Sequence, residues 1–284
     1  MSWRGGSRVT DQQALVRHLA SAIGPSSGIE ALFLGGSFGR GSADAFSDLD
    51  FLAVVPDERH GEAAAVWRGA LEAAAPVVYW SPRIGPPTLV NAITQDWMRV
   101  DLWMIDRASF LDHARSAQSV HAQSTLVPVI DPENLHASLP SRPPAPAANR
   151  RQVEYIVSEF IRVLGLIAVG MGRNELVLGV IGAGLLRDLL MRLMVEETHS
   201  PDRGGMLHLG RTITREQMAA LEALPCPGPR RAEILAAHWA AARAFFPRAQ
   251  ALAAALGIPW PDAFEQATRA HLQRAFGAQF TPWW

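Results

Sequence analysis

The sequence predicts an α+β fold in which a mixed sheet with flanking helices is followed by an all-α helical bundle. Short apolar runs of strand length alternate with helical segments up to residue 138. Residues 139–149 then read LPSRPPAPAAN, and their four prolines favour an extended backbone. From residue 150 to 284 the apolar residues recur at helical spacing. We therefore expect two domains, 1–138 and 150–284, joined by a proline-rich linker at 139–149.

The first domain should start with a helix that ends at Ala22, because Gly24 and Pro25 follow. A second helix is expected at 60–74. The expected strands lie at 29–34, 50–55, 77–80, 88–94 and 99–105. The last two should pair as a hairpin, and a glycine-rich loop at 35–41 should join the first two.

The second domain should consist of helices with recognisable ends. A long helix runs through the apolar residues from Val153 to Ile167, and Asn174 can cap a second one that continues to Glu197. Thr214 and Gln217 have the spacing of a capping box. The remaining helices are expected at 229–246 and 262–276.

The charge composition excludes several functions. All 26 basic residues other than histidine are arginine, and against 27 acidic residues they give a net charge of −1. Without lysine the chain has no P-loop of the GxxxxGK[ST] type and no Schiff-base chemistry, because both need an ε-amine. A charge near zero gives no basic footprint for duplex nucleic acid, so we expect no nucleic-acid partner.

Cysteine content and hydropathy indicate an ordinary cytoplasmic protein. Cys226 is the only cysteine, which excludes an internal disulfide. The first residues lack the apolar stretch of a signal peptide. The most apolar runs, 163–171 and 176–186, are shorter than the roughly 20 residues of a membrane span. We expect no membrane association, and the sequence leaves open whether the chain is a monomer or a homodimer.

Three aspartates form the main candidate site. Asp48 and Asp50 are two residues apart at the start of a strand, so their side chains share one face. Asp101 alternates with apolar residues in a later strand and faces away from the core. Carboxylates that converge in this way suit Mg²⁺, and three of them can hold two ions for a displacement at phosphorus. The alternatives are that Asp48 and Asp50 cap a polar turn and that Asp101 pairs with Arg99 or another arginine.

The loop before these aspartates is suited to phosphate groups. Gly36 and neighbouring glycines let the backbone approach phosphate oxygens, and Ser37 and Ser47 offer hydroxyl donors. Arg40 can add a charge-assisted contact. For Arg40 a solvated loop position is an equal alternative, and Ser47 is also a typical turn residue.

Together the segment GGSFGRGSADAFSDLDFLAVV and Asp101 in MRVDLWMID resemble the nucleotidyltransferase superfamily. With the C-terminal helical domain, the chain is similar to the antibiotic nucleotidyltransferases that modify aminoglycosides or lincosamides. The resemblance implies that 1–138 is the catalytic domain, with Asp48, Asp50 and Asp101 as catalytic metal ligands and Gly36 and Ser37 as the phosphate-binding pair. VPVIDPENL, at 127–135, resembles a strand and turn that close such domains.

The resemblance implies transfer of a nucleoside monophosphate, AMP from ATP, to a hydroxyl of a small molecule, with Mg²⁺ as cofactor. The helical domain would then form the other wall of a cleft and confer acceptor specificity. The candidate acceptor-binding residues are Glu154, Glu159, Glu175 and Trp103. The alternative function is a nucleotide-binding antitoxin or regulatory module, or a protein adenylyltransferase. Arg231 and His238 also have the spacing of a ribonuclease motif, which we interpret as a surface pair on a helix.

Overall fold

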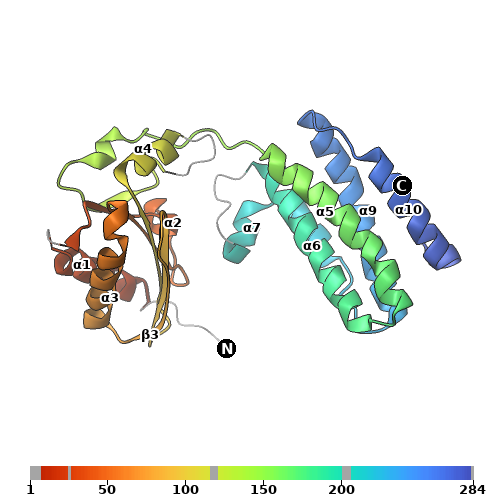
Figure 1. Ribbon diagram of the computed structural model, residues 1–284, viewed down its shortest axis with the longest axis horizontal. Coiled ribbons are helices and arrows are strands. Elements are labelled where there is room, and N and C mark those ends of the chain that lie inside the picture. The colour runs from red at the N-terminus through yellow and green to blue at the C-terminus, as the bar shows by residue number, and fades with distance from the viewer. Residues whose placement is uncertain (1–7, 25–26, 116–120, 200–205, 283–284) are drawn as a thin grey trace. The chain divides into compact units, whose positions relative to one another are not determined.

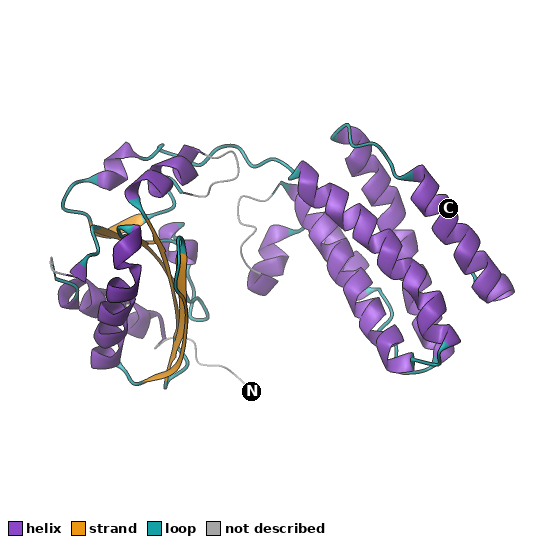
Figure 2. Ribbon diagram, viewed as in Figure 1, coloured by secondary structure: helices purple, strands orange, loops and turns teal. Residues whose placement is uncertain are grey.

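The computed structural model describes residues 8–24, 27–115, 121–199 and 206–282. The chain divides into two compact units, Met1–Ala145 and Pro146–Trp284. The division falls inside the proline-rich stretch. Figures 1 and 2 show strands only in the first unit and long helices in the second, so the expected fold class, a mixed sheet followed by a helical region, is confirmed.

The first unit is built on a six-stranded sheet of order β3-β4-β5-β2-β1-β6. The strands are β1 (Ala31–Leu34), β2 (Leu49–Val54), β3 (Val77–Arg83), β4 (Thr88–Thr94), β5 (Arg99–Ile105) and β6 (Val127–Ile130). Only β2 and β5 pair in parallel; the other neighbours are antiparallel, and β4 and β5 form the expected hairpin. The strand expected near residue 127 is β6, at one edge of the sheet.

Helices cover both faces of this sheet. They are α1 (Arg8–Ala22), α2 (Gly36–Gly39), α3 (His60–Ala74) and α4 (Arg107–Arg115). In Figure 1, α1 and α3 lie together against one face, where Leu19 and Trp67 are fully buried. On the other face Phe33 of β1 stacks on Phe110 of α4 with ring centroids 5.2 Å apart. The sheet therefore has an apolar layer on each face.

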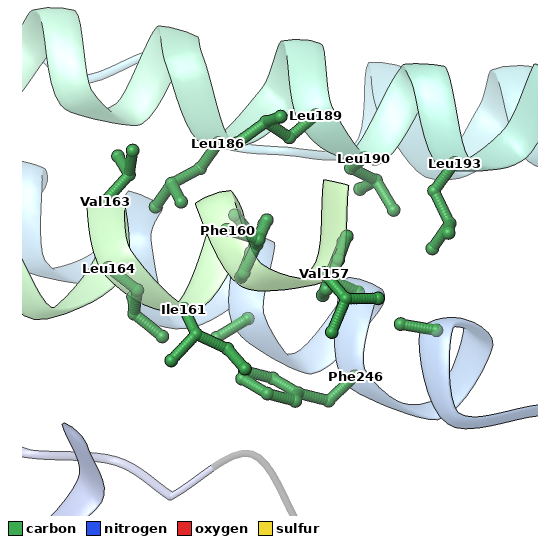
Figure 3. Packing of buried hydrophobic residues seen from close by; sticks show 14 of the residues in the cluster. Val157, Phe160, Ile161, Val163, Leu164, Leu186, Leu189, Leu190, Leu193 and Phe246 are labelled. Carbon is green, nitrogen blue, oxygen red and sulfur yellow. The ribbon is translucent and has the colours of Figure 1, made fainter. Parts of the chain in front are cut away.

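The second unit consists of helices around one apolar core. They are α5 (Arg150–Gly172), α6 (Leu176–Thr198), α7 (Leu209–Thr212), α8 (Arg215–Glu222), α9 (Arg231–Ala255) and α10 (Asp262–Phe276). Figure 3 shows Phe160 of α5 between Leu186 of α6 and the residues of α9. The Phe160 ring also stacks on that of Phe245, with ring centroids 3.7 Å apart. In length and composition α5 could cross a membrane, but nine of its residues are buried in the core, as in core helices generally.

Several expected boundaries are wrong. The glycine-rich loop contains the short helix α2, and β3 runs to Arg83 instead of ending at 80. Asn174 does not cap α6: Glu175 holds that position, while Asn174 has a φ of 57° and reverses the chain between two long helices. Asparagine tolerates this left-handed conformation, so it serves the turn better than the cap. The helix expected at 229–246 continues through Pro247 to Ala255, because residues beyond the proline are buried in the core.

The capping box at Thr214 is confirmed and gives a stability prediction. Its side chain accepts a hydrogen bond from the Gln217 backbone N–H at 3.1 Å, and the Gln217 side chain accepts one from the Thr214 backbone N–H at 2.8 Å. Replacing Thr214 with alanine should lower the free energy of unfolding by about 1 kcal/mol. A serine at the same position can still cap the helix, so the serine variant should keep most of the stability that the alanine variant loses. Thermal or denaturant unfolding measures the difference, and equal stability of the two variants would contradict it.

Candidate active site

The structure brings the three aspartates together at one end of β2 and β5. Asp48 directly precedes β2, Asp50 lies in β2, and Asp101 lies in β5. In the parallel β2–β5 pair, Asp50 and Asp101 are directly opposite each other. One carboxylate oxygen from each of the three residues lies within 4.8 Å of the others. The side chains are half-buried, so the cluster is reachable from solvent.

Crowding of these acids changes their protonation. The pKa of Asp50 is raised to about 6, chiefly by burial and also by the negative charges of Asp48 and Asp101, while the positive charges of Arg40 and Arg99 oppose the rise. Burial also raises the pKa of Asp101, but Asn91 opposes this by donating a hydrogen bond of 2.8 Å from its Nδ2 to Oδ1. A bound cation is the usual way to relieve such repulsion. The all-oxygen donor set fits Mg²⁺.

The turn between β1 and α2 is built around Asp50. The Gly35 N–H donates to the Asp50 backbone carbonyl at 2.8 Å. Gly36 has a φ of 55°, and a Cβ there would lie 2.7 Å from the Asp50 Cγ and closer still to Oδ2. The next residue, Ser37, is buried, and its Oγ has no hydrogen-bond partner among the described residues. This unpartnered hydroxyl lies one residue from Gly36, which lines the cavity beside the carboxylates.

Arg40 and Ser47 are also expected to bind nucleotide, but only Arg40 is among the residues that line the cavity. Arg40 ends α2 and lines the cavity next to Asp50. Ser47 is buried: its Oγ accepts from the Asp44 backbone N–H at 2.9 Å and donates to Asp44 Oδ1 at 3.2 Å. Its hydroxyl thus stabilises the turn before Asp48.

The sequence marks one neighbour of the acids, Arg99, and does not mark another, Asn91. Asn91 lies directly opposite Asp101 in the β4–β5 pair, and no motif marks it. Strand alternation predicts that Arg99 shares a face with Asp101, and the charge of Arg99 does lower the pKa of that residue. Its closest carboxylate contact is with Asp48, whose Oδ2 lies 3.3 Å from the Arg99 Nη1.

A cavity of about 330 Å³ opens beside the acids. The residues that line it include Gly36, Arg40, Asp50, Asn91, Asp101 and Trp103. Asp50 of β2, Asp101 of β5 and Asn91 of β4 are neighbours across the sheet. Two residues further along these strands, the equivalent neighbours are Leu52, Trp103 and Leu89. The Trp103 ring packs edge-on against His121, also in the lining, with centroids 5.8 Å apart. The cavity therefore has an anionic end and an apolar, aromatic wall.

The three glutamates expected to bind an acceptor lie in the second unit. Glu154 pairs with Arg150 at 3.2 Å, and Glu159 pairs with Arg162 at 2.6 Å. Glu175 is exposed at the N-terminus of α6. Two of the three thus have a partner on their own helix.

The interpretation of Arg231 and His238 as a surface pair is wrong. His238 is 1% exposed, and its Nδ1 hydrogen-bonds to the Ile234 carbonyl at 2.8 Å. Arg231 Nη1 donates to the Met171 carbonyl at 3.2 Å. The helix α9 packs its histidine face into the bundle core, so this pair does not form an exposed ribonuclease-like site.

The raised pKa of Asp50 predicts how metal-free stability depends on pH. A folded-state pKa of about 6, above the ordinary 3.8, means that the folded form binds the proton more tightly. This residue therefore favours folding most below pH 4, and that contribution is lost as the pH rises through 6. His121 acts in the opposite direction, because burial lowers its pKa to about 4. The difference between the protein and its Asp50→Asn variant removes the histidine contribution.

We expect Asp50→Asn to gain stability over the unaltered protein at pH 7 and to lose most of that gain as the pH falls below the ordinary aspartate pKa of 3.8. Thermal unfolding in the presence of a chelator measures both values. A constant difference between the two proteins over this pH range would contradict the prediction.

Comparison with known proteins agrees with the geometry of the first unit. Residues 17–91 match the model of the family described as nucleotidyltransferase domain, a range that includes the glycine turn, Asp48 and Asp50 and ends before Asp101. Among solved structures, an aminoglycoside 6-adenyltransferase from Bacillus subtilis is similar at 16% sequence identity and a TM-score of 0.42, over 92% of this chain and 97% of that chain. A search of curated proteins finds no match. The resemblance inferred from the Gly-Ser and Asp-x-Asp motifs is thus confirmed: the chain carries a nucleotidyltransferase domain.

Proposed function

We propose that the protein is a Mg²⁺-dependent nucleotidyltransferase that moves AMP from ATP to a hydroxyl of a small molecule, with an aminoglycoside-like or lincosamide-like compound as the acceptor class. The observation that carries the proposal is the convergence of Asp48, Asp50 and Asp101 within 4.8 Å, next to the cavity that Gly36 and Arg40 also line. An acidic triad of this kind is typical of metal-dependent nucleotidyltransferases.

In this mechanism the three aspartates would hold Mg²⁺, and the bound ion would stabilise the negative charge that develops on the phosphate oxygens. The Ser37 Oγ and the backbone around Gly36 bind the β- and γ-phosphates, and Arg40 adds positive charge at the same end of the cavity. The acceptor oxygen bonds to the α-phosphorus as the bond to the pyrophosphate oxygen breaks.

Asp101 is the candidate to receive the acceptor proton. Its pKa is raised by burial, which makes its carboxylate a better base than an ordinary aspartate. Asn91 fixes one of its oxygens at 2.8 Å and leaves the other for a metal or a proton. The aromatic wall next to Asp101, formed by Trp103, is suited to the ring system of an acceptor.

The proposal is tested by incubating the protein with MgATP and a panel of aminoglycosides and lincosamides. Pyrophosphate should be released only when an acceptor is present, and mass spectrometry should find one AMP unit on that acceptor. Omission of Mg²⁺ should stop the reaction. Lack of turnover with every compound would refute the acceptor class, while the nucleotidyltransferase domain would remain.

One observation favours protein adenylylation as the second candidate. The outer side of α6 exposes Val177 (66%), Leu178 (57%), Ile181 (52%) and Leu185 (49%). An apolar helix surface of this kind is typical of protein interactions. If this candidate is correct, radiolabelled ATP should label a protein band in an extract, and the drug panel should stay unmodified.

A further inference from the structure

Arg99 is a basic residue in direct contact with the acidic cluster. It is the first residue of β5 and lies two residues before Asp101, so both side chains project from the same face of the sheet. Its Nη1 lies 3.3 Å from the Asp48 Oδ2, and its Nη2 donates to the Phe46 backbone carbonyl at 3.1 Å. Arg99 thus links β5 to the turn that carries Asp48.

The Arg99–Asp48 pair occupies one of the carboxylates that a metal ion would need. Asp48 contributes one of the three carboxylates that converge within 4.8 Å. A guanidinium on Oδ2 neutralises that carboxylate while no cation is bound. A divalent ion that enters the cluster therefore meets a positive charge at the site.

The pair is also weak enough to be exchanged. At 3.3 Å it is longer than the roughly 2.7–2.9 Å of a strong charge-assisted hydrogen bond. The two side chains are 32% and 27% exposed, so water screens their attraction. The contact with the Phe46 carbonyl involves the other nitrogen, and it can persist when Asp48 is released.

We propose that Arg99 is a positioning residue that neutralises Asp48 in the metal-free protein and is displaced from it when a divalent cation binds Asp48, Asp50 and Asp101. This inference rests on the metal site of the proposed function. In this role Arg99 is a counter-ion that competes with the metal for Asp48. The cluster therefore does not carry an unbalanced negative charge before the cation binds.

A purely structural role for Arg99 predicts the opposite effect on metal affinity. If the residue only held the turn before β2 in place, its removal would misplace Asp48 and weaken metal binding. If it competes with the metal, its removal frees Asp48 and strengthens binding. The sign of the change therefore separates the two roles.

The experiment measures Mn²⁺ binding to the full-length protein without nucleotide, by calorimetry or by the electron paramagnetic resonance of free Mn²⁺. Arg99→Gln removes the charge and keeps a donor for the Phe46 carbonyl. Arg99→Lys keeps the charge. Arg68→Gln is the matched control, because it removes the same charge from an exposed pair with Glu72 on α3. Circular dichroism verifies that each variant is folded.

We expect Arg99→Gln to bind Mn²⁺ about tenfold more tightly than the unaltered protein, the size of effect that a nearby charge exerts in a half-exposed site. Arg99→Lys and Arg68→Gln should stay within about twofold of it. Unchanged or weaker binding by Arg99→Gln would overturn the role of Arg99 and leave the metal site intact. Absence of binding in every protein would overturn the metal site and this role with it.

Discussion

Replacement of Asp50 by asparagine should reduce nucleotidyl transfer by roughly a thousandfold or more while the fold stays intact. Asp50 is the central acid: it lies opposite Asp101 in the sheet, and the charges of both Asp48 and Asp101 raise its pKa. Asparagine has the same shape but lacks the charge that binds a cation. Pyrophosphate release in the presence of an acceptor measures the loss.

Stability should change in the opposite direction to activity. Because the pKa of Asp50 is raised to about 6, its ionised form opposes folding at pH 7 when no metal is bound. Asparagine removes this cost, on the order of 2 kcal/mol. Asp57→Asn, an exposed position outside the cluster, is the matched control and should change neither property. Activity of Asp50→Asn within tenfold of the original would contradict the assignment of this residue as a metal ligand.

Gly36→Ala should produce the second large effect, because the new methyl group would occupy the place of the Asp50 carboxylate. The Cβ would lie 2.7 Å from the Asp50 Cγ, and the φ of 55° adds backbone strain. We expect a loss of about 2 kcal/mol or more in stability and of about a hundredfold in activity, since small displacements of reacting groups are costly.

Gly41→Ala provides the control for backbone strain alone. Gly41 has a φ of 66°, but nothing lies within 4 Å of its hypothetical Cβ. It should lose about 1 kcal/mol of stability and keep its activity within a few-fold. Similar losses of activity in both variants would show that strain in the turn, and not contact with Asp50, decides the outcome.

Much of the first unit could be predicted from the sequence because its strands have clear patterns. Alternation in Arg99–Ile105 predicts that Asp101 lies on the face away from the core. In the structure the even-numbered residues of this strand are buried on the opposite face, in the core. The spacing of Asp48 and Asp50 likewise placed both near the start of β2. The parallel pairing of β2 with β5 joins segments about 50 residues apart, and nothing in either segment specifies it.

The parts of the site that could not be predicted depend on tertiary contacts. Asn91 has no motif, and its importance comes from lying opposite Asp101 across the β4–β5 pair. The short helix α2 was expected to be a loop, because its glycines have a low intrinsic helix propensity. There the close approach of the backbone to Asp50 determines the conformation. Pro247 shows the same effect, since packing of α9 outweighs the local preference of proline.

In-register pairing of Asp50 with Asp101 has a consequence for how this domain can vary. The separation of these two acids is set by the distance between neighbouring strands, which is the same in any sheet. The long connection from β2 to β5 can therefore accept insertions or be redesigned at β3 without altering that separation. A single-residue deletion inside either strand would turn one acid to the opposite face and abolish the cluster.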